Sequence, residues 1–101
     1  MFRRARFAEL IESQLDLFEQ DQRAVIDETD ARLEAYNRAG RDEAEELYGD
    51  YLDAVETGTE LLADMRDHYA QSLDEPDGYL REFNKAVARR LPPFALEIEN
   101  T

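Results

Sequence analysis

The sequence predicts an all-α fold: a long antiparallel helical hairpin followed by a short third helix. Three observations lead to this prediction. Small and apolar side chains between Ala44 and Leu73 recur at steps of four and three residues, which is the period of one buried helix face. The four glycines and three prolines fall mostly at the predicted helix ends. No alternating run rich in β-branched residues, the pattern of a strand, occurs before the last eight residues.

The first helix is expected over about residues 2–39, because apolar residues keep helical spacing through this stretch. Arg38 suits the negative pole of the helix dipole, and Gly40 is expected in the left-handed conformation just past the last turn. The expected buried face consists of Phe7, Leu10, Ile11, Leu15, Leu17, Phe18, Val25, Leu33 and Tyr36.

The second helix is expected over about residues 41–73, and it opens with a cluster of acids that the positive pole of the helix dipole favours. If the chain folds back near residue 40, the apolar faces of the two helices coincide over a hairpin about 50 Å long. This antiparallel pairing brings Phe7 to Leu73 and Val25 to Val55. It also places the long side chain of Gln22 opposite Gly58, where a gap is available.

The third helix is expected over about residues 76–91, because Pro76 is tolerated only in a first turn and Pro92 and Pro93 end the pattern. It is too short to reach the hairpin tip, so we expect it to cover the open end. In the tail, 92–101, Phe94, Leu96 and Ile98 alternate with less apolar residues, and we expect an extended segment. That segment either lies over the core or pairs with a neighbouring molecule.

The hairpin tip carries more apolar surface than one two-helix seam can bury, and an exposed patch of this kind marks an interaction site. We expect a homodimer in which two tips form a four-helix bundle. Two alternatives are a single hairpin with a partly wet, tyrosine-rich surface and a site for an unidentified protein partner. The predicted interface residues are Val25, Leu33, Tyr36, Tyr48, Tyr51 and Val55.

The formal net charge is −13, from 25 acidic and 12 basic residues. Such an excess repels free nucleic acid and anionic membranes, and it is best tolerated where salt screens it. We therefore expect either adaptation to a high-salt cytoplasm or the codon bias of a GC-rich genome. Without cysteines, the chain has no disulfide or thiolate site. No membrane span or secretion signal is recognisable, so we expect a soluble cytoplasmic protein.

Few residues have side chains that could take part in catalysis or bind a metal ion. His68 is the only histidine, and Asp64 lies one turn before it on the helix flank, away from the apolar stripe. Ser13 and Ser72 have no base at helical spacing. The chain has no phosphate-binding loop, no zinc spacing and no cofactor motif, and no motif identifies a family. We therefore predict no catalytic, metal or cofactor-binding residues.

The function that the sequence favours is a non-catalytic protein–protein interaction or scaffold module. Two alternatives from other classes stay open. One is a nucleic-acid accessory protein that contacts phosphates through Arg3, Arg4 and Arg6, which the acidity disfavours. The other is a helical bundle that binds a metal ion through carboxylates.

Overall fold

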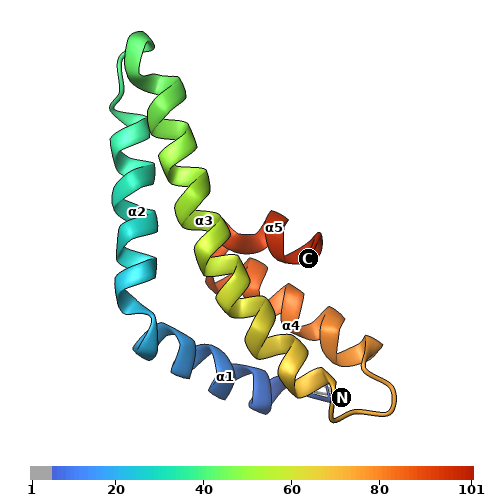
Figure 1. Ribbon diagram of the computed structural model, residues 1–101. Helices are drawn as coiled ribbons and strands as arrows, with labels where there is room; N and C mark the ends of the chain where they lie inside the picture. The colour runs from blue at the N-terminus through green and yellow to red at the C-terminus, as the bar shows by residue number, and fades with distance from the viewer. Residues whose placement is uncertain (1–5) are drawn as a thin grey trace, which may run out of the picture.

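The computed structural model describes residues 6–101, and it confirms the predicted all-α class, since the described chain contains no strand (Figure 1). The predicted start of the first helix, at about residue 2, lies outside the described residues. The helical elements are α1 (Ala8–Asp21), α2 (Arg23–Asn37), α3 (Arg41–Ala70), α4 (Asp77–Arg90), the 3₁₀ turn η1 (Pro92–Phe94) and α5 (Ala95–Glu99).

Helix α2 and the first half of α3 pack as an antiparallel pair that projects from the rest of the molecule (Figure 1). We call this pair, residues 23–60, the arm. A guanidinium nitrogen of Arg32 in α2 donates a hydrogen bond to the backbone oxygen of Asp50 in α3 at 2.7 Å. The projecting arm makes the molecule elongated, with extents of 51 × 30 × 23 Å.

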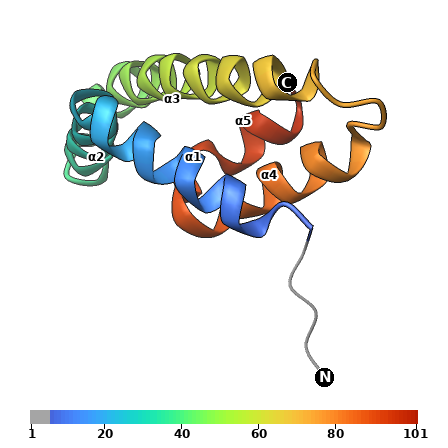
Figure 2. The same cartoon turned by 90° about the horizontal axis from the view of Figure 1, so that it is seen from below.

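The predicted continuous first helix is wrong, because the chain bends at Gln22 into α1 and α2. The backbone of Gln22 has φ −113° and ψ 30°, yet its N–H still donates to the oxygen of Phe18 and its oxygen still accepts from Ile26. No glycine or proline marks this bend. It arises from packing, since α1 turns away from α3 and lies against α4 (Figure 2).

The remaining elements form what we call the base: α1, the second half of α3, α4, η1 and α5. In this part of the molecule, side chains from every element meet in one core. Figure 2 shows α5 lying between α3 and the layer of α1 and α4. The largest fully buried apolar side chains are Leu15, Phe18, Leu62, Tyr79, Phe83, Val87, Phe94 and Ile98.

The predicted extended tail is also wrong, because residues 92–99 form η1 and the short helix α5. The tail lies over the core of its own chain, as Phe94 and Ile98 are buried. These two residues are one helical turn apart, so a helix buries both. Leu96, which an extended strand would place on the same side, is 70% exposed.

Gly58 explains how the tail reaches α3. A Cβ atom at position 58 would lie only 2.6 Å from Cζ of Phe94, which is too close for any side chain. The ring of Phe94 therefore packs against the bare backbone of α3. The predicted pairing of Gln22 with Gly58 is wrong for this reason, since an aromatic ring from the other end of the chain fills the gap.

The backbone conformation of Gly40 also differs from the predicted left-handed one. Gly40 is the residue before α3 and has φ −76° and ψ 168°, an extended conformation open to any residue. Its oxygen accepts hydrogen bonds from the N–H groups of Glu43 and Ala44. The turn between α2 and α3 therefore needs no left-handed glycine, and α3 begins directly after it with Asp42 and Glu43 in its first turn.

Arg66 is a charged residue inside the base, with only 4% of its surface exposed. Its guanidinium donates to Asp67 at 2.7 Å, to the side-chain oxygen of Asn84 in α4 at 3.0 Å and to the backbone oxygen of Ile98 in α5 at 3.1 Å. A buried charge is tolerated when it is paired and fully hydrogen-bonded. Arg66 therefore joins α3, α4 and α5 through polar contacts that an apolar side chain could not make.

Tyr79 is the centre of an aromatic cluster at the open end of the base. Its ring lies 5.4 Å from Phe7, 4.8 Å from Tyr69 and 5.9 Å from Phe83. Its hydroxyl donates to Oε1 of Gln14 at 2.9 Å. Burial raises the pKa of Tyr79 above the ordinary value of a tyrosine. The fold therefore holds this phenol in its neutral form.

Alanine substitutions at Gly49 and Gly58 are expected to have opposite effects on stability. A Cβ at Gly49 meets open space, so Gly49→Ala should raise the free energy of unfolding by about 1 kcal/mol through helix propensity alone. Gly58→Ala gains the same propensity but overpacks Phe94 by about 1–3 kcal/mol, so the net effect should be a loss of about 1 kcal/mol. Urea denaturation followed by circular dichroism measures both. Equal stabilisation by the two changes would contradict the packing described here.

Tyr79→Phe is expected to lower the free energy of unfolding at neutral pH by about 1 kcal/mol, because the hydrogen bond to Gln14 is lost. The pKa of Tyr79 is raised in the fold, so its contribution is complete below about pH 10 and is lost as the pH rises through the folded-state pKa. The difference between wild type and variant should therefore shrink above about pH 10. Thermal unfolding at a series of alkaline pH values tests this, and parallel curves at all pH values would contradict it.

Candidate functional site

One face of α3 is covered from Val55 onward and uncovered nearer the hairpin tip. Six residues at steps of four and three share this face: Tyr48, Leu52, Val55, Thr59, Leu62 and Arg66. The last four are 4% exposed or less. Tyr48 is 44% exposed and Leu52 is 41% exposed, although they continue the same stripe. Burial of this face therefore ends between Leu52 and Val55.

The reason is the limited reach of the C-terminal elements. The elements η1 and α5 contact α3 at Gly58, where Phe94 packs, and at Arg66, which bonds to Ile98. Nearer the hairpin tip, only α2 lies beside α3 (Figure 1). The outer part of the arm, from Leu52 toward the tip, therefore presents an apolar strip that is only partly covered within the described residues.

Three tyrosines lie together at the exposed end of this face: Tyr48 on the stripe, Tyr51 beside it on α3, and Tyr36 on α2. The rings of Tyr36 and Tyr48 lie 5.1 Å apart and inclined at 52°, while those of Tyr48 and Tyr51 lie 6.2 Å apart at 42°. Tyr36 and Tyr51 are half-buried. Partial burial, followed by the nearby Tyr48 and Asp30, raises the pKa of Tyr51. The cluster forms a partly exposed aromatic surface.

The structure distributes the predicted interface residues over different environments. Tyr36, Tyr48 and Tyr51 lie together, and Leu33 is half-buried on α2. Val55 belongs to the core, so it offers no surface to a second molecule. Val25 lines a separate hollow of about 270 Å³ between α2 and α3, together with Ala24, Glu28, Arg32, Ala54 and Thr57. Leu52 is not among the predicted interface residues, but it is more exposed than most of them. Its position on the stripe is the sequence signal that marks it as part of this surface.

The surroundings of this face are strongly acidic. Residues 41–60 contain eight acids and a single base, Arg41. The acids lie on the exposed sides of α3, whereas Tyr48 and Leu52 lie on the stripe. The arm therefore combines an apolar strip with a negatively charged border. Any partner of like charge meets repulsion there unless salt screens it.

The residues considered for chemistry do not form a reactive group. His68 and Asp64 are both exposed on α3, and the hydroxyl of Ser72 donates to the backbone oxygen of Tyr69. Across residues 6–101, no three His, Asp or Glu side chains are placed so as to hold a metal ion. Arg3 and Arg4 lie outside the described residues, and Arg6 stacks over the ring of Phe7 at 4.9 Å.

Comparison with protein-family models, with curated proteins and with solved structures found no match to this chain. In residues 6–101, none of the helices combines the length and apolar character needed to cross a bilayer.

Proposed function

We propose that the protein is a non-catalytic interaction module that self-associates through its arm. The observation that carries this proposal is the abrupt change in burial along one face of α3. From Val55 to Arg66 the stripe is buried, and nearer the hairpin tip the same stripe ends in the exposed side chains of Leu52 and Tyr48. An apolar helix face of this kind is stabilised when another helix covers it.

A second copy of the chain is a suitable partner because of the arm's own geometry. Helices α2 and α3 already form an antiparallel pair, so two arms related by a twofold axis would make a four-helix bundle. Each protomer would then cover the tyrosines and Leu52 of the other. Tyrosine suits such a seam, since its ring is buried while its hydroxyl reaches water at the edge.

Charge makes this association dependent on salt. Two arms bring two copies of the same acidic border together, so the dimer should be weakened at low ionic strength. At about 1 M salt the Debye length falls to about 3 Å, and the repulsion between exposed carboxylates is largely removed. This behaviour agrees with the expectation of a high-salt cytoplasm. It also predicts that the dimer tightens as salt is added.

Leu52→Glu is expected to dissociate the dimer without unfolding the monomer, because it places a charge in the exposed stripe and removes no core contact. Light-scattering mass, measured from low salt to about 1 M, should show that the wild type approaches twice the monomer mass as salt rises. The variant should keep the monomer mass throughout, with an unchanged helical circular dichroism spectrum.

Leu96→Glu is the matched control, since it makes the same change at a leucine that is 70% exposed on α5, outside the arm. It should dimerise like the wild type. If both variants lose the dimer equally, general charge repulsion is the cause and the arm is not the interface. A wild type that stays monomeric at every salt concentration would refute self-association.

A further inference from the structure

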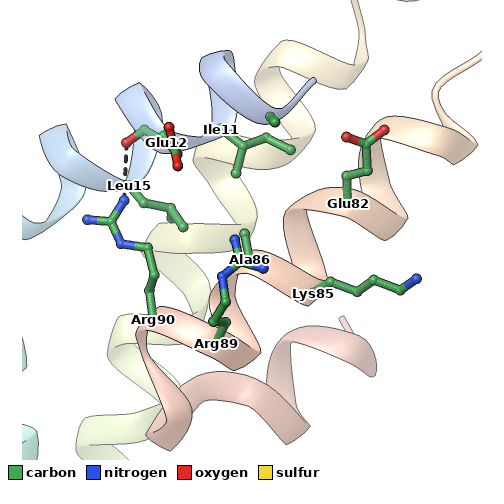
Figure 3. A pocket seen from close by; sticks show the side chains of 9 residues that line it. Ile11, Glu12, Leu15, Glu82, Lys85, Ala86, Arg89 and Arg90 are labelled. Carbon is green, nitrogen blue, oxygen red and sulfur yellow. Dashed lines mark hydrogen bonds between the residues drawn. The ribbon is translucent and has the colours of Figure 1, made fainter. Parts of the chain in front are cut away.

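A cavity of about 140 Å³ lies between α1 and α4, in the base and away from the arm (Figure 3). Its floor is apolar and consists of Ala8, Ile11 and Leu15 from α1 and Ala86 from α4. Ile11, Leu15 and Ala86 are buried, so the floor is a part of the core surface. Because both helices carry an alanine here, no long apolar side chain fills the space between them.

Five charged residues surround this floor, namely Glu12, Glu82, Lys85, Arg89 and Arg90, and three of them, Glu12, Glu82 and Arg90, have partners elsewhere. Glu82 accepts a hydrogen bond from the backbone N–H of Phe7 at 3.0 Å. Arg90 donates to the carboxylate of Asp16 at 2.8 Å and to the backbone oxygen of Glu12 at 3.3 Å. These contacts connect α1 to α4 at the two ends of the cavity.

Lys85 and Arg89 are the other two charged residues that line the cavity. Within residues 6–101, neither side chain forms a hydrogen bond or an ion pair, although the chain holds 25 acids and only 12 bases. The two are one turn apart on the same face of α4. In Figure 3 the guanidinium of Arg89 lies beside Ala86 and points toward α1, whereas Lys85 extends outward. Arg89 therefore presents free donors next to the apolar floor.

We propose that this cavity binds a small organic anion, namely a carboxylate that carries one aromatic ring or short alkyl chain. A cavity of about 150 Å³ lined by apolar side chains is large enough for a benzene molecule, so one ring fits the volume observed here. The ring would contact Ile11, Leu15 and Ala86. The carboxylate would accept the paired N–H donors of Arg89, whose planar fork matches its geometry. Lys85 supplies a second positive charge at the outer edge.

The probe for the first test is phenylacetate, added to ¹⁵N-labelled full-length protein in low-salt buffer and followed by amide chemical shifts. Saturable shifts are expected at Ile11, Leu15, Ala86 and Arg89, while amides of the arm stay unchanged. Acetate, which lacks the ring, should bind at least about tenfold more weakly because it buries no apolar surface. Benzylamine has the ring with the opposite charge, and equal binding of benzylamine and phenylacetate would overturn the proposal.

Substitutions can test the contribution of the positive charge to binding separately from the contribution of the cavity volume. Arg89→Gln should weaken phenylacetate binding by about fivefold, the upper range for an ion pair that is open to solvent. Arg81→Gln is the matched control, because it removes the same charge from an exposed position of α4 that does not line the cavity, and it should change binding less than about twofold.

Ala8 lines the cavity and is half-buried, so Ala8→Leu places a larger apolar side chain in the cavity and leaves every charge unchanged. It should abolish the shifts with phenylacetate while the helical circular dichroism spectrum is retained. Binding that persists in this variant, or that Arg81→Gln weakens as much as Arg89→Gln does, would show that the anion is held elsewhere. The proposed site lies in the base alone, so the outcome of these experiments does not depend on self-association through the arm.

Discussion

The ring of Phe94 lies directly on the backbone of α3 at Gly58, and the rest of the fold depends on this contact. Because residue 58 has no side chain, η1 and α5 can pack close against α3 and bury Phe94 and Ile98 in the core. Helix α1 leaves α3 at Gln22 and packs against α4, on the other side of these C-terminal elements (Figure 2).

The two halves of the molecule consequently differ in how they are stabilised. The base has a closed core, an aromatic cluster around Tyr79 and the buried guanidinium of Arg66, whose hydrogen bonds join three helices. The arm has a single seam between two helices and a row of partly exposed tyrosines. The acidic border of the arm adds repulsion that salt weakens. This contrast places the proposed association in the arm and the proposed anion site in the base.

Residue patterns allowed part of the candidate surface to be predicted. Tyr36, Tyr48 and Tyr51 recur at helical spacing near the turn, and the structure brings their rings together. The pattern could not tell that Val55 is buried whereas Leu52 and Tyr48 of the same stripe are exposed, because burial depends on how the helices pack and not on spacing along one helix. Nor could it reveal the cavity beside Arg89, since that space depends on the distance between α1 and α4. Arg66 did carry a signal, as it falls one turn after Leu62 in the apolar stripe.

The sequence by itself determined the helical class and the stripe along α3, because these follow from the local period of apolar side chains and from the positions of glycine and proline. It also determined the charge that governs how the surface responds to salt. Only the tertiary structure decided the bend at Gln22, the helical form of the tail and the extent of the uncovered face. The physical reason is that each of these depends on side chains distant in sequence competing for the same space, and Gly58 with Phe94 shows which of them occupies it.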